Sequence, residues 1–439
     1  MTPRRTGCSV RHEQSGEQRG SLRVAARDAH ESPADATRGA STAGEAQLGS
    51  SVTSPRSQPD VLPHIPFNKP AIVGRELSYI SQALHQGHSA GDGSFSRRCQ
   101  RSLEHALGVP KVLLTTSCTD ALEMAAVLLD IAPGDEVIVP SFTFVSTVNA
   151  FVLRGATPVF VDIRPDTLNM DERKVERLVT ARTKAIVPVH YGGVGCEMES
   201  IGQIAARRGI AIVEDNAHGL FSQYRGRYLG TFGTFAAQSF HETKNFTCGE
   251  GGALVVNDER YVQRAEIIRE KGTDRSRFFR GEVDKYTWVD IGSSHLPSDI
   301  LAAFLFAQLE ARESIQSRRR EIWERYYDDL GQWASSFDVR LPVVPDHCEQ
   351  SFHLFYLLMP SAESRQRLIR HLKDRGIQSV FHYLPLHLSP MGQRCGGSRA
   401  QCPVTESVSD TLLRLPFYYD MTEHDQMRVV EAVKAFRLQ

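Results

Sequence analysis

The chain has 439 residues, and its 51 basic and 52 acidic residues nearly cancel, which disfavours nucleic acid or an anionic membrane as the main partner. No run of about eighteen apolar residues occurs, so we expect no transmembrane helix. The eight cysteines are scattered without a CxxC pair, which disfavours a disulfide framework or a metal site and favours a reducing cytoplasm.

The N-terminal region differs in composition from the rest of the chain. Residues 1–60 are rich in Ser, Arg, Gly, Ala, Thr and Glu, with almost no aromatic or aliphatic clusters. Such a segment cannot bury enough apolar surface to offset the entropy of ordering, so we predict a disordered tail. Its acidic residues argue against a transit peptide, and the lack of an apolar stretch argues against a secretion signal.

From Ile65 onward, short apolar strand patterns alternate with helix-length segments. A helix with an apolar face is predicted over 119–130, directly after the first of these strands. Repeated βα units with Val- and Ile-rich strands favour a mostly parallel sheet covered on both faces, in a large domain over 61–310. The predicted strands are 112–115, 136–139, 159–163, 185–189, 210–213, the end of the apolar run 232–240, and 253–256.

A smaller C-terminal domain of α+β type is predicted over 311–439. A long helical stretch over 298–330 links it to the large domain. Its own elements are strand patterns at 353–359 and 378–382 and helices over 363–375 and 422–436.

Polar residues follow two of the predicted strands in the first half of the chain. The run Thr115-Thr-Ser-Cys-Thr119 joins a strand to a helix start, where N–H groups and hydroxyls suit a phosphate. The alternative is a plain helix N-cap, which Ser and Thr also favour. Phe144 follows the strand that ends near Pro140 and could stack on a flat ring, although an aromatic at such a point is more often part of the core.

Two later strand ends carry ionisable groups. Asp215 follows an apolar strand and is expected to need a cationic partner, such as a protonated ring nitrogen, and His218 can face the same ligand. Lys244 lies in a polar turn after Ser239, where desolvation favours a neutral amine able to form a Schiff base. The alternatives are an N-capping Asp, a satisfied histidine and an ordinary loop lysine. Parallel strand ends meet at one edge, so these sites converge in space.

A phosphate, a flat ring, a basic ring nitrogen and an aldehyde satisfy all four sites, and pyridoxal 5′-phosphate (PLP) contains all of them. The order of these motifs, together with Pro133-Gly-Asp-Glu-Val137 and Gly249-Glu-Gly-Gly252, resembles the sugar-nucleotide aminotransferases of the DegT/StrS group. The resemblance covers nearly everything from Ile65 to Phe436. It implies an α/β protein of the aspartate-aminotransferase-like fold type I, with a large mostly parallel αβα sandwich domain and a smaller C-terminal α+β domain.

The resemblance also implies roles for individual residues. Lys244 corresponds to the residue that binds the cofactor aldehyde, and Asp215 to the one that holds the pyridine nitrogen. The remaining cofactor-binding positions are Thr119, Phe144, His218, Ser239 and Ser294, and the substrate positions are His382, Tyr383 and His387. No metal is implied. Ser294 stands where many relatives have an Asn that reaches the partner subunit's phosphate, and Asp120 must point away from the anion.

Within the group, the chain most resembles the dTDP-4-amino-4,6-dideoxygalactose transaminases. The runs that carry this resemblance are Ser239–Asn245, Arg280–Trp288, Ile291–Ser294 and Leu296–Asp299. They imply that a homodimer transfers an amino group from L-glutamate to dTDP-4-dehydro-6-deoxy-D-glucose. They also imply a role in surface polysaccharide or enterobacterial common antigen biosynthesis.

Three alternatives stay open at this point. The chain could aminate another nucleotide-linked keto sugar, or it could be a non-catalytic PLP-binding regulatory protein. A related sugar 3-dehydratase has His at the lysine position, and the presence of Lys244 argues against that activity.

Overall fold

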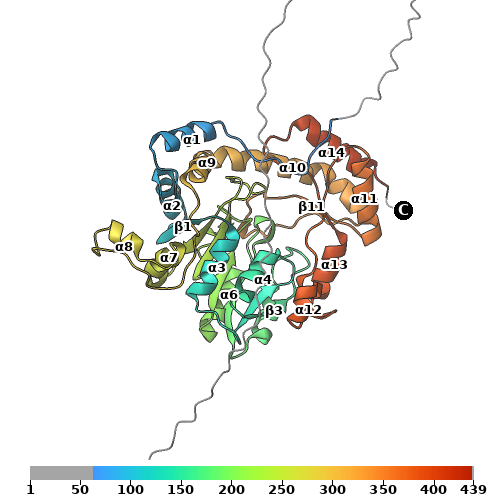
Figure 1. Cartoon of the computed structure of the whole chain (residues 1–439). Helices are drawn as coiled ribbons and strands as arrows, with labels where there is room; N and C mark the ends of the chain where they lie inside the picture. The colour runs from blue at the N-terminus through green and yellow to red at the C-terminus, as the bar shows by residue number, and fades with distance from the viewer. Residues whose placement is uncertain (1–62, 438–439) are drawn as a thin grey trace, which may run out of the picture. The chain divides into compact units, whose positions relative to one another are not determined.

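We describe a computed structural model of the chain, which covers residues 63–437 (Figure 1). The tail predicted over 1–60 lies outside these described residues. Within them, no helix is long and apolar enough to cross a bilayer.

A seven-stranded sheet forms the centre of the described chain. Six strands point the same way, and only β9 runs antiparallel to both of its neighbours. The prediction of a mostly parallel sheet is confirmed, with this one inserted exception. In spatial order the strands are β1 (Lys111–Thr115), β9 (Gly252–Val256), β8 (Phe235–Ser239), β5 (Ala211–Asp215), β4 (Thr183–Ile186), β2 (Glu136–Pro140) and β3 (Thr157–Val161).

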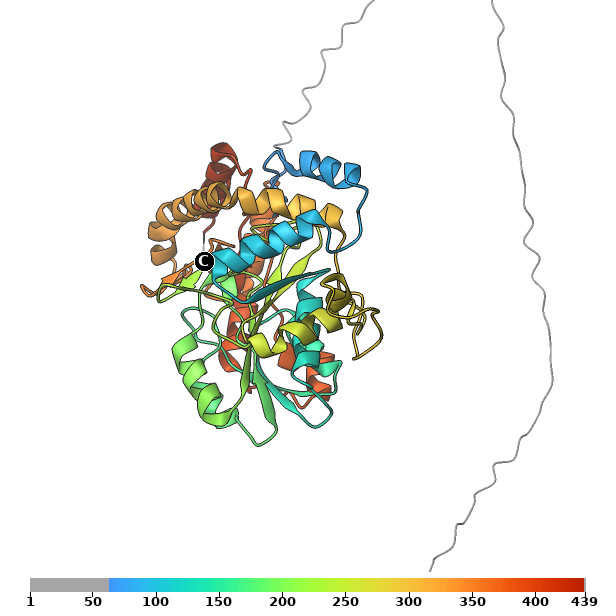
Figure 2. The same cartoon turned by 90° about the vertical axis from the view of Figure 1, so that its left-hand side faces the viewer.

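Helices cover both faces of this sheet, because successive strand side chains point to opposite faces. Leu113 packs with α3 (Cys118–Leu128), α4 (Val145–Val152) and α7 (Val262–Arg269). Its neighbours Val112 and Leu114 pack on the other side with α2 (Ser94–Leu107) and α9 (Asp299–Glu310), and α6 (Met198–Arg208) covers the same face further along (Figures 1 and 2). This arrangement confirms the predicted α/β layers.

The C-terminal part has a hydrophobic core of its own. The helices α10 (Arg312–Ser336), α11 (Ala362–Lys373) and α14 (Glu423–Ala435) pack around the antiparallel pair β11 (Tyr356–Leu358) and β12 (Leu412–Arg414). The domain boundary at residue 310 stays a prediction. The remaining elements are the helices α1 (Glu76–His85), α5 (Glu172–Val175), α8 (Arg275–Phe279), α12 (Pro390–Arg394) and α13 (Pro403–Thr411), and the small sheet of β6 (Gln223–Tyr224), β7 (Arg227–Tyr228) and β10 (Cys348–Glu349).

Two sequence-based predictions in this region need correction. The single helix predicted over 298–330 is two helices, α9 and α10, which follow one another in Figure 2. Ala311 separates them because its backbone, at φ −90° and ψ 12°, leaves the helical geometry. The strand predicted over 378–382 is reduced to one bridge between Val380 and Arg414, because β12 is only three residues long and pairs with β11.

Candidate active site

The ends of β1, β2, β5 and β8 meet at one edge of the sheet, beside a cavity of about 730 Å³. Segments from the C-terminal part also line it. Eight of the ten residues proposed from the sequence line this cavity: Thr119, Phe144, Asp215, His218, Ser239, Lys244, His382 and Tyr383.

Lys244 lies in the turn between β8 and β9 and faces the cavity. Its main-chain N–H donates to the carbonyl oxygen of His241 at 2.9 Å, which closes the turn. Burial lowers the pKa of Lys244 to about 8, because a poorly solvated site disfavours the ammonium form. A substantial fraction of this amine is therefore neutral near neutral pH and available as a nucleophile.

The next residue, Asn245, fixes the lysine turn to the C-terminal part. Its side-chain amide donates to the carbonyl oxygen of Ser351 at 2.7 Å, and its Oδ1 lies 2.9 Å from Nδ1 of His353. A carbonyl oxygen accepts, so Nδ1 of His353 carries the proton. The position of Lys244 thus depends on residues that follow it by more than a hundred positions.

Asp215 ends β5 and is buried, with both carboxylate oxygens held by donors. The hydroxyl of Thr147 donates to Oδ2 at 2.6 Å, and the main-chain N–H of Ala217 donates to Oδ1 at 3.2 Å. The hydroxyls of Thr143 and Thr147 lie 2.8 Å apart. Since the Thr147 proton goes to the carboxylate, Thr143 donates to Thr147. The carboxylate is therefore oriented before any ligand binds.

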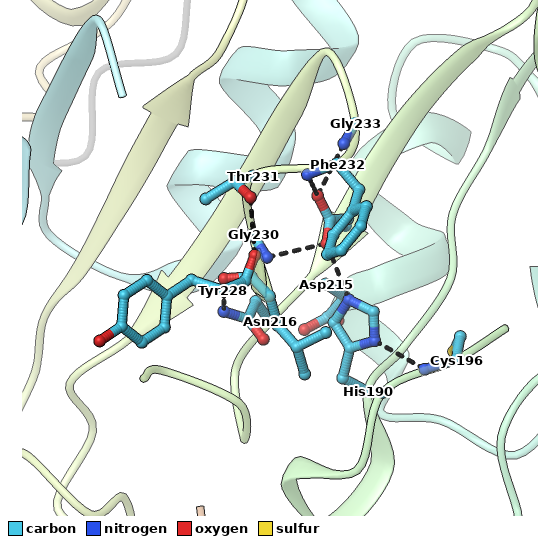
Figure 3. Close-up of polar contacts among 12 residues, drawn as sticks. His190, Cys196, Asp215, Asn216, Tyr228, Gly230, Thr231, Phe232 and Gly233 are labelled. Carbon is cyan, nitrogen blue, oxygen red and sulfur yellow. Dashed lines mark hydrogen bonds and ion pairs between the residues drawn. The ribbon is translucent and has the colours of Figure 1, made fainter. Parts of the chain in front are cut away.

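Glu214, the neighbour of Asp215, points to the other face of β5 and is fully buried. Its carboxylate accepts four hydrogen bonds, from Nε2–H of His190 (3.0 Å) and from the main-chain N–H groups of Gly230 (2.8 Å), Phe232 (2.7 Å) and Gly233 (2.7 Å) (Figure 3). The N–H of Cys196 donates to Nδ1 of His190 at 3.2 Å, which leaves the His190 proton on Nε2. These bonds compensate the buried charge and hold the end of β5 in place.

His218 lies in the cavity wall between two other imidazoles. Its ring stacks on His353 at a centroid distance of 4.1 Å and lies 6.1 Å from His382. Burial holds the pKa of His218 well below its usual value, and the charge of Lys244 adds to this shift. Nδ1 accepts the N–H of Gly192 at 3.3 Å, so the neutral ring carries its proton on Nε2.

The first turn of α3 approaches the cavity beside the start of β9. Ser117 caps the helix by accepting the N–H of Asp120 at 3.0 Å, and the hydroxyl of Thr119 donates to Ser146 at 2.8 Å. A Cβ on Gly252 would lie 2.3–2.4 Å from the main chain of Ser117 and Cys118. The missing side chain of Gly252 therefore lets the helix N-terminus come this close.

Asp120 does not face an anion placed at this helix start. The hydroxyl of Thr116 donates to one of its carboxylate oxygens, and Nδ1 of His295 lies 3.4 Å from the other.

Several aromatic side chains of the cavity wall form one group. Phe144, which precedes α4, is 58% exposed and lies 6.5 Å from the ring of Tyr383. Tyr383 contacts His382, whose Nδ1 lies 3.0 Å from the hydroxyl of Tyr191. Burial raises the pKa of Tyr383 and lowers that of His382, so both side chains are neutral around pH 7.

Two of the ten residues proposed from the sequence, His387 and Ser294, do not line this cavity. His387 is fully buried outside the cavity wall, with Nδ1 2.6 Å from the hydroxyl of Ser141 and Nε2 3.1 Å from Glu406. Ser294 is exposed and forms an isolated bridge with Glu270.

Comparison with known proteins agrees with this site. Residues 70–434 match the model of the DegT/DnrJ/EryC1/StrS aminotransferase family. The chain belongs to this family. It is 33% identical over 378 residues to the spore coat polysaccharide biosynthesis protein SpsC of Bacillus subtilis. The matched region covers 84% of this chain and 96% of SpsC.

Solved structures show the same fold. The PLP form of Spr1654 from Streptococcus pneumoniae is 28% identical, with a TM-score of 0.78 over 84% of this chain and 98% of that one. The aminotransferase TlmJ from Streptoalloteichus hindustanus is 31% identical, with a TM-score of 0.77 over 84% of this chain and 98% of TlmJ. These findings confirm fold type I, a PLP-dependent sugar aminotransferase as the enzyme class, and PLP as the cofactor.

The residues of this DegT/DnrJ/EryC1/StrS member fit PLP. The cavity offers a nucleophilic amine at Lys244, an oriented buried carboxylate at Asp215, and a helix start opened by Gly252. An aldehyde, a basic ring nitrogen and a phosphate are the partners that these three groups suit.

Sequence reasoning missed several cavity residues. Thr143 and Thr147 stand four positions apart at a helix start, a spacing that could have indicated a hydroxyl pair beside the sheet edge. His353 and Arg414 also line the cavity. Nothing in their local sequence indicates this, because their places depend on how the C-terminal part packs.

Proposed function

We propose that the enzyme transfers the amino group of L-glutamate to dTDP-4-dehydro-6-deoxy-D-glucose, which gives dTDP-4-amino-4,6-dideoxy-D-galactose and 2-oxoglutarate. The observation that carries the proposal is that one cavity contains both the amine of Lys244, with its lowered pKa, and the carboxylate of Asp215. The choice of sugar is supported by the runs 239–245 and 280–288, which resemble transaminases of that product.

In this proposal, Lys244 and Asp215 are the catalytic residues. When bound, PLP supplies an aldehyde and an electron-withdrawing ring. Lys244 would hold the aldehyde through its nitrogen, and its free amine would move a proton to and from the reacting carbon. Asp215 would keep a proton on the ring nitrogen, because a carboxylate at that position favours the charged form of the ring. Thr147 and Ala217 hold Asp215 in the required orientation.

The other cavity residues bind and orient. Thr119 and Ser239, with the N–H groups of the first turn of α3, would hold the phosphate. Phe144 would cover the flat ring, and His218 would donate from Nε2 to an oxygen of the ligand. His382 and Tyr383 are proposed to contact the nucleotide sugar.

The proposal also includes the oligomeric state and the cellular location of the enzyme. We expect a homodimer, in which the exposed Ser294 would approach the phosphate bound by the partner subunit. The described cysteines are free thiols, which is compatible with the cytoplasm. The name of SpsC supports a place in polysaccharide biosynthesis, with enterobacterial common antigen as the specific expectation.

The deciding experiment incubates the enzyme with L-glutamate and dTDP-4-dehydro-6-deoxy-D-glucose and analyses the product by mass spectrometry and NMR. We expect a 4-amino sugar with the galacto configuration. An equatorial amine, or preference for another substrate in a panel of UDP-, GDP- and 3-keto sugars, would refute the choice of sugar. A non-catalytic regulatory protein would bind PLP but release no 2-oxoglutarate from glutamate.

A further inference from the structure

Arg414, the last residue of β12, is a charged side chain of this cavity to which the roles above assign nothing. Its main chain pairs with Val380, with an N–H to O distance of 2.7 Å, and its side chain lines the cavity. The guanidinium lies 4.6 Å from the ring centroid of Phe67, and Nη2 is 3.4 Å from the carbonyl oxygen of Phe381. Nε is buried and has no hydrogen-bond partner among residues 63–437.

The positive charge of Arg414 is not balanced by the described part of the chain. No carboxylate between residues 63 and 437 lies within 4 Å of it. Burial lowers its pKa, yet a guanidinium remains protonated in proteins. A poorly solvated cation without a counter-ion is costly, and the cost is removed when an anion binds.

Arg319 shows what a structural buried arginine looks like in the same chain. Its Nε donates to the carbonyl oxygen of Phe352 at 3.0 Å, Nη2 donates to that of His353 at 2.5 Å, and its guanidinium packs on Phe417 at 4.7 Å. These donors are satisfied, and Arg319 does not line the cavity. Arg414 differs because it keeps free donors at the cavity.

The position of Arg414 limits which anion it can bind. The phosphate of the cofactor is proposed above to bind at the start of α3, which belongs to the large domain. Arg414 lines the same cavity as Lys244, His218 and His382, and its positive charge helps to lower the pKa of each of these groups. In an amino acid, a carboxylate is attached to the carbon that bears the exchanging nitrogen. In a nucleotide sugar, the sugar ring separates the diphosphate from the reacting carbon.

We propose that Arg414 is the residue that binds a carboxylate of the amino donor, through the paired N–H donors of its guanidinium. The proposal rests on the function proposed above and adds to it the site of the acidic donor. Arginine and carboxylate form planar, two-bonded pairs. The Phe67 ring lies 4.6 Å from the guanidinium, and Tyr383 lines the same cavity.

The test separates the two half-reactions, each followed by the change in visible absorption of the bound cofactor. Arg414→Gln and Arg414→Lys are compared with the wild-type enzyme. Arg365→Gln is the matched control, because Arg365 is also half-buried, also has its pKa lowered by burial, donates to the carbonyl oxygen of Ser409, and does not line the cavity. Thermal unfolding of each variant shows whether the fold is kept, and the lysine variant preserves the charge.

For Arg414→Gln we expect the glutamate concentration at half-maximal rate to rise about 10- to 100-fold, as loss of a charge-assisted pair predicts. The lysine variant should recover part of this loss. The dTDP-amino-sugar half-reaction and the affinity for PLP should change by less than threefold, and Arg365→Gln should change neither half-reaction. Comparison of L-alanine with 4-aminobutanoate as donors then shows which carboxylate is bound.

Glutarate provides a readout that needs no turnover. Its binding, seen as a shift in cofactor absorption, should weaken in Arg414→Gln to the same degree as glutamate binding. Loss in the sugar half-reaction alone, weaker PLP binding alone, or no change in glutarate affinity would each overturn the proposal. Failure on the dTDP sugar with intact glutamate and glutarate responses would refute the proposed sugar and leave the role of Arg414 supported.

Discussion

The hydroxyl of Thr147 lies 2.6 Å from Oδ2 of Asp215 and joins the first turn of α4 to the end of β5. The two residues are 68 positions apart, so only the packing of α4 beside the sheet brings them together. The contact positions the carboxylate that we propose to face the ring nitrogen of the cofactor.

Thr147→Val tests this contact, because valine has nearly the same shape and lacks the hydroxyl. We expect the free energy of unfolding to fall by about 1–3 kcal/mol, since a buried acceptor loses its donor. The glutamate half-reaction should slow several-fold, because Asp215 loses an orienting bond. Denaturant unfolding and single-turnover absorption measure the two effects, and Thr147→Ser should restore both. An unchanged stability would show that the hydrogen bond contributes nothing.

Asp215→Asn tests the carboxylate itself. Asparagine keeps the shape and removes the negative charge that favours a protonated ring nitrogen. We expect PLP to remain attached at Lys244, with its visible absorption, while the glutamate half-reaction slows by about 10²–10³-fold, as loss of a preorganised charge can produce. A half-reaction at the wild-type rate would exclude the proposed role.

The lowered pKa of Lys244 predicts how PLP loading depends on pH. Burial favours the neutral amine, so the rate at which apoenzyme reacts with added PLP should rise with pH and level off above about 8. At pH 7 the neutral fraction should be roughly 300-fold larger than for an ordinary lysine of pKa 10.5. Stopped-flow absorption measures the rate, with a small-molecule amine as reference. A rate that keeps rising to pH 10 would contradict the shift, and Lys244→Ala should give no absorption of this kind.

Gly252→Ala tests the close approach of α3 to β9. The added Cβ would clash with the main chain of Ser117 and Cys118, so the helix start must move away from the proposed phosphate site. We expect PLP to bind about tenfold more weakly and the protein to lose about 1–3 kcal/mol of stability, as other overpacked sites do.

Gly202→Ala is the control for this prediction, because a Cβ there meets nothing within 4 Å and should leave PLP binding unchanged. Fluorescence titration of apoenzyme gives the affinity. Wild-type affinity in Gly252→Ala would show that the helix start is not where the phosphate binds.

Local sequence patterns were sufficient to predict the layers of the fold. Short Val- and Ile-rich strands separated by helices specify a covered parallel sheet, since each strand must bury both of its faces. The polar residues after these strands could be placed at one edge for the same reason, and this is why Lys244 and Asp215 could be assigned to one site. Local pattern could not show the break at Ala311, where a single residue departs from helical geometry in an otherwise continuous apolar stretch.

The sequence by itself determined the parallel α/β layers and the strand-end residues of the cavity, because these follow from local periodicity and short motifs. The fold type and the family followed from the resemblance of those motifs to known aminotransferases. Only the tertiary structure decided that His387 is buried against Ser141 and Glu406, and that His353 and Arg414 enter the cavity. Those positions depend on packing between segments far apart in the chain, and no local preference encodes that packing.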